Sequence, residues 1–447
     1  MKKSLLFALC TLLPLAAAAQ QNWKAVTRYD KQDAKTKLTE RLTDYVTYDT
    51  QAGTDTDKVP SSKGQTAFAK KLAKDLKRIG AQNVTVSKNG AVTADIPSTS
   101  ANTLPTLLFA APMDTTPALS GKDVKPQVHA KYNGGDIIIN PQANVRLTQY
   151  NSPQLMSART HDLITASGGT VLGADAKAGA AVLLTYADYL LGNTSVAHGP
   201  VKLLFIPDTL NGRGTDALQP AGLGADYAFV LGAGNTGEYT SENFNVRYFT
   251  AVFEGDRTQD PGNAMYSDFA DNLLMAADFH TLLPRQRRPE TTAGNRGFIW
   301  VNDITHNGNT STVKGEIHAF TDQELQELTD LVNQSFNTVK SLYPKRKSEK
   351  LTFTDGAKNL RPSLPPQMPA QLQEAMQKEE ITPVPVPRRD HGGPAAALTA
   401  GGLPAIGLFN GSFNSGTELE YADADVMEAA LRTLLTLTAD WPAQSAG

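Results

Sequence analysis

The chain has 447 residues, of which 40% are hydrophobic and 19% are charged. A chain of this length forms more than one domain and has ample residues for a buried core. The formal net charge of -3 argues against a basic patch for nucleic acid or for a membrane surface. We therefore expect a globular protein that binds no nucleic acid.

Residues 1–19 have the pattern of a cleavable secretory signal peptide, with a basic start, an apolar stretch from Ser4 to Leu15, and small residues before Gln20. The one cysteine of the chain, Cys10, lies inside this segment, so we expect a mature protein without a disulfide or a thiol nucleophile. No later segment is long and apolar enough to span a bilayer. We expect a periplasmic or secreted protein that begins near Gln20 and has no membrane span.

The spacing of apolar residues predicts the first elements of the fold. Helices are expected over 35–48 and 65–79, because large apolar residues recur there at intervals of three and four residues. The Asn89-Gly90 pair predicts a hairpin between strands over 84–86 and 91–96. Further along the chain, the sequence predicts strands over 105–111 and 201–206 and a closing helix over 425–441.

The central stretch Gly168–Leu184 places an acidic residue between an apolar run and a helix. The apolar run ends at Gly173, which permits a tight turn, and a buried helix is expected from Lys177 onward. Asp175 stands between the two. A carboxylate at this place lies at the mouth of an open α/β sheet, where ligands bind, or it caps the helix through its side chain. The pattern leaves both roles open.

Three segments resemble motifs of the peptidase T family, the tripeptide aminopeptidases. Gly173–Gly179 resembles the G-A-D-x-K-A-G element, Ala111–Pro117 resembles H-x-D-T-x-P, and Pro207–Gly214 resembles P-D-E-E-V-G-R-G. The resemblance extends over nearly the whole mature chain. Members of this family are di-zinc metallopeptidases with a lid domain inserted in the catalytic domain.

The resemblance implies an α/β fold in two domains. A zinc-exopeptidase-like, catalytic-like domain with a mixed sheet between helices would comprise residues 20–244 and 344–447. Residues 245–343 would form an inserted α+β, ferredoxin-like lid or dimerisation domain, through which two chains can pair as a homodimer. The pattern in this insert predicts a strand, a helix, two strands, a helix and room for a last strand. Residues 348–366 are polar and contain prolines, so we expect them to be irregular.

The same resemblance implies that most of the zinc site is lost. In the family, five side chains bind the two zinc ions, and Asp175 stands at the position of the bridging aspartate. The other four ligand positions hold residues without a ligand atom in the side chain: Pro112, Leu210, Gly232 and Leu419. The position of the general base holds Thr209. We therefore expect no catalytic residue and no zinc cofactor.

Seven further residues are candidates for the cleft between the two domains: Asp114, Arg213, Asp260, His318, Arg388, Arg389 and His391. Asp114 matches a family aspartate that orients the site, but it can equally be a carboxylate that receives hydrogen bonds from a turn. The arginines can hold a peptide carboxylate, or they can simply be solvated.

These losses predict a secreted, catalytically inactive peptidase T-like protein that binds short peptides or a protein partner. The alternative is an active, metal-dependent tripeptide aminopeptidase with relocated zinc ligands, such as Asp175, His391 and Glu418. A third hypothesis is a purely structural protein that is dimeric through the lid. Zinc content and peptide hydrolysis distinguish the first two hypotheses.

Overall fold

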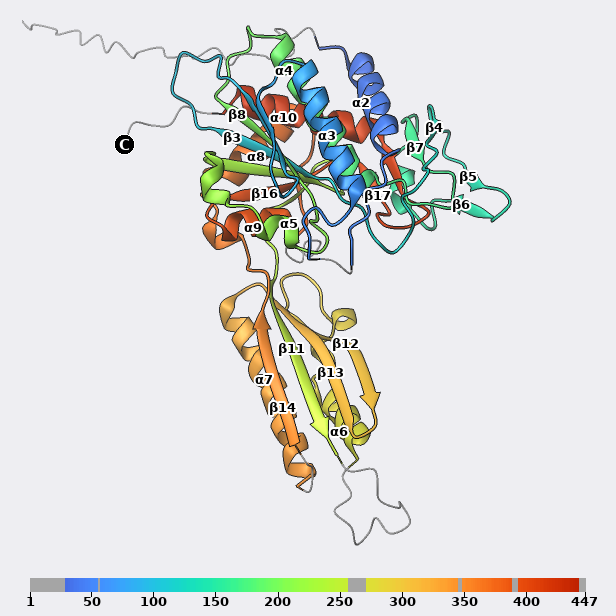
Figure 1. Cartoon of the computed structure of the whole chain (residues 1–447), viewed down its shortest axis with the longest axis vertical. Helices are drawn as coiled ribbons and strands as arrows, with labels where there is room; N and C mark the ends of the chain where they lie inside the picture. The colour runs from blue at the N-terminus through green and yellow to red at the C-terminus, as the bar shows by residue number, and fades with distance from the viewer. Residues whose placement is uncertain (1–28, 55–56, 256–270, 345–347, 388–392, 442–447) are drawn as a thin grey trace, which may run out of the picture.

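The computed structural model describes residues 29–441 except 55–56, 256–270, 345–347 and 388–392. The predicted signal peptide and four candidate residues lie outside the described residues: Asp260, Arg388, Arg389 and His391. The described chain forms an α/β domain from which a smaller lid domain extends at one end (Figure 1). None of the described helices is long and apolar enough to cross a membrane.

A mixed eight-stranded sheet forms the centre of the catalytic-like domain. In spatial order its strands are β1 (Gln82–Val86), β2 (Val92–Ile96), β8 (Val201–Ile206), β3 (Leu107–Pro112), β9 (Tyr227–Gly232), β16 (Ala405–Phe409), β10 (Glu238–Thr240) and β15 (Val384–Pro385). The four strands from β8 to β16 are parallel, whereas β2 and β10 run antiparallel to their inner neighbours. The antiparallel pairing of β1 with β2 confirms the predicted hairpin.

Alternate residues of the central strands enter two different cores, as the two-residue period of a strand requires. In β3, Phe109 and Ala111 pack in the larger core, and Leu108 and Ala110 pack in a smaller core on the other side. The smaller core includes residues of α9 (Pro394–Ala400), which contacts α5 (Arg213–Asp216). The larger core is covered by α2 (Lys31–Tyr45), α3 (Lys63–Arg78), α4 (Ala174–Gly192), α8 (Gln367–Lys378) and α10 (Ala424–Ala439).

Helix α4 lies in the larger core and carries the predicted site residue Asp175. It begins at Ala174, earlier than the predicted start at Lys177, because Gly173 adopts a φ of 78° and serves as the N-cap. A Cβ atom on Gly179 would lie 3.1 Å from a side chain of β3. The helix therefore packs closely on the sheet and holds its first turn at the end of the central strands.

Two small sheets lie on one flank of the catalytic-like domain (Figure 1). One contains, in spatial order, β17 (Ser412–Phe413), β18 (Tyr421–Asp423), β7 (Leu163–Thr165) and β4 (Gln127–His129), and the other pairs β5 (Ile137–Asn140) with β6 (Val145–Leu147). Short 3-10 helices are η1 (Pro153–Met156), η2 (Pro220–Leu223) and η6 (Arg361–Ser363). Strand β18 matters for the site because Glu420, just before it, lies beside the start of α4.

The lid domain is a four-stranded antiparallel sheet with two helices packed on it. Its strands are, in spatial order, β12 (Phe298–Asn307), β13 (Thr310–Ala319), β11 (Asn245–Glu254) and β14 (Ser348–Asp355). Its helices are α6 (Asn272–Leu282), α7 (Asp322–Leu342), and the short 3-10 helices η4 (Arg285–Arg287) and η5 (Pro289–Thr291). Phe279 of α6 and Val332 of α7 share one core with the sheet residue Phe249. This arrangement confirms the predicted ferredoxin-like lid.

Two further predictions about element boundaries are wrong. Residues 348–355 form β14 instead of an irregular segment, so the lid sheet extends beyond the predicted boundary at 343. Leu351 and Phe353 pack against the lid core, and their alternation with polar residues is a strand pattern that the prolines further along obscured. Helix α2 begins before the predicted 35–48, because the Asp30 side chain accepts a hydrogen bond from the backbone of Asp33 at 2.8 Å.

Candidate functional site

A cavity of about 360 Å³ opens where the parallel strands of the central sheet end. Strand β3 ends at Pro112, β9 at Gly232 and β16 at Phe409, and all three residues line the cavity. The carboxyl edge of a parallel sheet is the place where α/β folds bind ligands. Six sequence-predicted positions lie together in this lining: Pro112, Asp114, Asp175, Thr209, Leu210 and Gly232.

The cavity walls are mainly apolar. They include six large apolar or proline side chains: Val230, Leu231, Val386, Pro394, Leu408 and Phe409. Among the described lining residues, one further carboxylate accompanies the two aspartates, that of Glu238. Its Oε2 atom accepts a hydrogen bond from the backbone N–H of Asn235 at 2.7 Å. The arrangement suits a small ligand with an apolar body and one polar group.

Asp114 is buried, and the turn after β8 donates to both oxygens of its carboxylate. Oδ1 accepts hydrogen bonds from the backbone N–H and the hydroxyl of Thr209 at 2.9 and 2.7 Å. Oδ2 accepts from the backbone N–H of Leu210 at 2.9 Å. Burial raises the pKa of Asp114, and these hydrogen bonds oppose that rise. Asp114 thus holds the turn that carries Thr209 and Leu210.

Asp175 lies in the first turn of α4, and its side chain is partly exposed to the cavity. Its Oδ1 atom accepts a hydrogen bond from the backbone N–H of Ala176 at 2.9 Å. The N-cap of the helix is Gly173. Asp175 is therefore not the N-cap residue, although its side chain accepts one N–H of the first turn of the helix.

Two other charged side chains, both buried, surround Asp175. Glu420 accepts hydrogen bonds from the backbone N–H groups of Gly173 and Asp175 at 2.8 and 3.0 Å. Lys177 Nζ donates to the carbonyl oxygen of Tyr48 at 2.6 Å. Burial raises the pKa of Asp175 to about 6 and that of Glu420 to about 8, and it lowers the pKa of Lys177 to about 8.

The sequence analysis names Glu418 as a relocated ligand, whereas the structure brings Glu420 to the backbone of Asp175. Glu418 is exposed, whereas Glu420 is buried beside α4. A signal for Lys177 was present, since it is the only basic residue in the otherwise mostly small and apolar run Gly173–Leu184. No local pattern marks Glu420, because strand pairing brings it to Asp175 from a distant part of the chain.

Three other predicted positions are not among the residues that line the cavity. Leu419 is partly buried against the larger core. Arg213 begins α5, and its Nη2 atom lies 3.9 Å from the carboxylate of Asp57. His318 is buried in the lid, where its ring stacks on Phe298 with ring centroids 4.5 Å apart. The structure places neither Arg213 nor His318 in the cavity.

The described lining of the cavity does not fit a pair of zinc ions. Such a site needs about three to five protein ligands, usually with imidazoles among them. The described lining residues offer three carboxylates, from Asp114, Asp175 and Glu238, and no imidazole. Asp114 and Glu238 already accept backbone hydrogen bonds. The ligand atoms of the three also do not gather within 4.8 Å of one another, as they do in the group described next.

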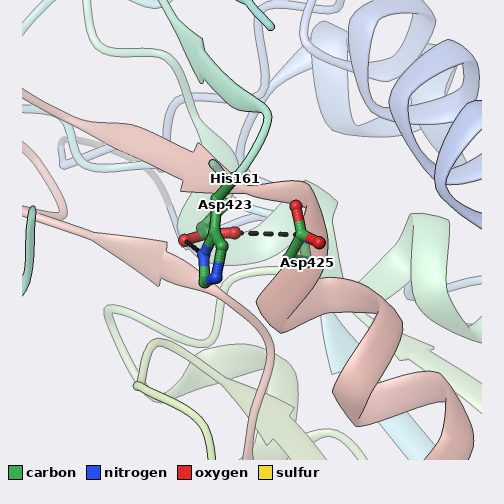
Figure 2. Close-up of side chains that lie close together, drawn as sticks. All are labelled: His161, Asp423 and Asp425. Carbon is green, nitrogen blue, oxygen red and sulfur yellow. Dashed lines mark hydrogen bonds and ion pairs between the residues drawn. The ribbon is translucent and has the colours of Figure 1, made fainter. Parts of the chain in front are cut away.

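His161, Asp423 and Asp425 form one group of converging ligand atoms, at the start of α10 (Figure 2). His161 Nδ1 lies 2.7 Å from Asp423 Oδ2, and this hydrogen bond raises the pKa of His161. Lys35 Nζ lies 3.0 Å from Asp425 and 2.9 Å from Asp162. The ammonium group of Lys35 already balances the charges of Asp162 and Asp425. This cluster therefore holds α2 against α10 and offers little to a metal ion.

Comparison with known proteins identifies the family. No family model matches the chain. Peptidase T from Caldanaerobacter subterraneus subsp. tengcongensis is 33% identical over 403 residues, which cover 90% of this chain and 98% of that protein. Peptidase T from Bacillus licheniformis is 33% identical over 405 residues, with the same coverage of 90% and 98%.

Solved structures share the fold of this chain. Aminopeptidase PepT from Bacillus cereus superposes with a TM-score of 0.72 and 16% identity, covering 91% of this chain and 98% of its own. A dinuclear metal-binding peptidase from Bacillus subtilis superposes with a TM-score of 0.63 and 14% identity, covering 92% and 98%. The two peptidase T relatives are 33% identical over 90% of this chain, so the chain belongs to the peptidase T family.

Proposed function

We propose that this protein binds short peptides in the cavity at the sheet edge and does not hydrolyse them. One observation carries the proposal. Of the positions that hold zinc ligands in the resemblance, only Asp175 has a ligand side chain, and the cavity formed there by Pro112, Leu210 and Gly232 is largely apolar. Zinc in a hydrolase activates water and polarises the substrate carbonyl, and a lining without a ligand set cannot hold it.

Thr209 cannot replace the missing general base. A base must accept a proton, but the Thr209 hydroxyl donates to Asp114 at 2.7 Å. A hydroxyl also loses its own proton only far above neutral pH, so it cannot activate water as a carboxylate does. Loss of a general base alone lowers a rate by roughly 10²–10⁴-fold. Thr209, in the turn after β8, therefore supplies no general base.

The second candidate is a metal-dependent aminopeptidase with relocated ligands. The relatives are named peptidase T, and two site carboxylates, Asp114 and Asp175, are present in the cavity. His391, a predicted relocated ligand, lies outside the described residues. Glu418, the other, is exposed and is not among the described lining residues. The described residues thus favour the first candidate.

Calorimetry and product analysis on one sample test the proposal. The purified mature chain is titrated with the tripeptide Leu-Gly-Gly, with and without added zinc, and free leucine is measured by chromatography. We expect saturable binding and no leucine. Chelator-sensitive release of leucine would favour the second candidate. If none of a panel of short peptides binds, the hypothesis of a purely structural protein would be favoured instead.

A pair of glycine variants tests whether the cavity is the binding place. A Cβ atom on Gly232 meets no atom within 4 Å, and the same holds for Gly192 at the end of α4. Gly232→Leu places a side chain in the cavity, and Gly192→Leu places the same side chain on a remote surface. We expect the first variant to lose peptide binding and the second to keep it.

We further propose that the chain is exported to the periplasm or secreted, on the pattern of residues 1–19. N-terminal sequencing of the protein recovered from a bacterial periplasm tests this, with Gln20 as the expected first residue. Pairing of two chains through the lid stays a prediction from the resemblance. Sedimentation of the full mature chain checks it.

A further inference from the structure

We infer that the carboxylate of Asp175 binds the terminal ammonium of a peptide whose first side chain is apolar. The inference rests on the proposed function, because it names the ligand class of the same cavity. The ammonium group of the peptide lies beside Asp175, which is the one residue with a carboxylate among the positions that hold zinc ligands in the family. The ligand is recognised by its free amino terminus together with its first side chain.

The geometry of Asp175 leaves one oxygen available. Oδ1 accepts the N–H of Ala176 at 2.9 Å, which fixes the orientation of the carboxylate. Oδ2 accepts no hydrogen bond from the residues that the structure describes, and the side chain lines the cavity. A carboxylate fixed at one oxygen and open at the other suits a charge-assisted hydrogen bond to an ammonium group.

Among the residues that the structure describes, the lining of the cavity carries carboxylates and no lysine or arginine. Asp114 and Glu238 lie on the same lining as Asp175. The nearby base, Lys177, directs its Nζ atom to the carbonyl of Tyr48. A positive ligand group therefore relieves repulsion between carboxylates, whereas a carboxylate on the ligand adds to it.

An ammonium group fits this lining better than a metal ion does. A divalent metal requires several converging ligand atoms, whereas an ammonium has three donors and satisfies them with scattered acceptors or water. Most of the other described lining residues are apolar, Leu210, Leu231 and Leu408 among them. Burial of an apolar side chain against these walls favours binding, because it removes apolar surface from water. The volume of about 360 Å³ lies near the small end of ligand pockets, which span roughly 300–1,000 Å³, so one residue with its amino terminus fills much of it.

Three peptides on the unmodified protein test the inference by calorimetry. Leu-Gly-Gly carries both recognised groups, N-acetyl-Leu-Gly-Gly lacks the ammonium, and Glu-Gly-Gly has an acidic first side chain. We expect acetylation to weaken binding at least about tenfold, which corresponds to 1.4 kcal/mol, and Glu-Gly-Gly to bind more weakly than Leu-Gly-Gly.

Two matched variants locate the contact. Asp175→Asn keeps an oxygen for the N–H of Ala176 but removes the charge, and Asp322→Asn makes the same change in the first turn of α7 in the lid, where the side chain is exposed. We expect only the first variant to bind Leu-Gly-Gly as weakly as the acetylated peptide.

The outcomes separate the two proposals. Equal affinity for the free and the acetylated peptide overturns the inference but leaves peptide binding in the cavity intact. Binding of Glu-Gly-Gly as tight as that of Leu-Gly-Gly overturns the preference for an apolar side chain. Absence of binding by every peptide overturns both the inference and the proposed function. Because the peptide comparison uses the unmodified chain, a variant that fails to fold does not remove the test.

Discussion

Replacing Asp175 by asparagine is predicted to stabilise the folded protein at neutral pH. Burial raises the pKa of this carboxyl from 3.8 to about 6, which means that the folded state disfavours its ionised form. Above pH 6 the group is nevertheless ionised in both the folded and the unfolded chain. The folded state therefore carries an electrostatic cost that the neutral amide removes.

The size of this effect follows from the two pKa values. One pKa unit corresponds to 1.36 kcal/mol, and the difference between about 6 and 3.8 is about 2 units, which gives an upper limit of about 3 kcal/mol. The charge also interacts favourably with the N-terminal end of α4, which is worth about 0.3–1 kcal/mol and is lost in the variant. Because the side chain is partly exposed to the cavity, screening lowers the gain further. We expect the free energy of unfolding to rise by about 1–2 kcal/mol at pH 7.

The gain has a defined pH dependence. A carboxyl whose pKa is raised on folding costs stability above its folded pKa, and that cost disappears as the pH falls towards the unfolded pKa. The difference between variant and wild type should therefore be largest at pH 7 and above. It should shrink as the pH falls through about 6, the folded pKa of Asp175, and vanish near pH 4.

Urea unfolding at pH 4, 5, 6 and 7, followed by tryptophan fluorescence, measures this difference. Trp441 is buried against Phe229 in the catalytic-like domain and reports on the domain that contains Asp175. Asp322→Asn in the lid serves as the control, because that side chain is exposed, and it should change stability by less than about 1 kcal/mol. If Asp175→Asn destabilises the protein at pH 7, or if its gain does not change between pH 4 and 7, the reasoning about burial cost is refuted.

Three further predictions concern packing and charge. Gly179→Val should lower the free energy of unfolding by about 1–3 kcal/mol in the same urea assay, because its Cβ would lie 3.1 Å from that of Ala111; unchanged stability would contradict the close packing of α4. Lys35→Met should lower the midpoint of thermal unfolding, since it leaves Asp425 without its cation, at a cost of about 1–3 kcal/mol for a partly buried pair; calorimetry showing no decrease would contradict this role. Leu210→Glu combined with Gly232→Asp should confer zinc binding that the wild type lacks, because both positions line the cavity beside Asp175 and a Cβ at 232 meets open space; equilibrium dialysis that shows no gain would contradict the assignment of these positions.

The sequence predicts the architecture well where apolar periodicity is strong. The lid elements, the hairpin at Asn89-Gly90 and the closing helix follow from spacing and turn chemistry, and the structure confirms them. Strand β14 was missed because polar residues and prolines further along outweighed the alternation of Leu351 with Phe353. The start of α4 was misplaced because a glycine before a helix can be either a turn or an N-cap, and only its φ decides.

The candidate site was predicted only in part. Six expected positions line one cavity, because motifs after successive strands meet at the same sheet edge. Glu420 could not be assigned, since its burial depends on pairing between β18 and β7, far apart in the sequence. His318 was expected in the cleft, but the stacked ring of Phe298 places it in the lid interior. Residue type alone does not show which polar side chains are buried or where.

The metal content of the protein distinguishes a zinc-free binding cavity from a hydrolytic zinc centre. The full mature chain is purified without a chelator, equilibrated with excess zinc, freed of unbound metal by gel filtration, and measured by mass spectrometry. The described lining lacks a ligand set, so we predict far less than one zinc ion per chain. Retention of two zinc ions per chain, lost on Asp175→Ala, would contradict the account.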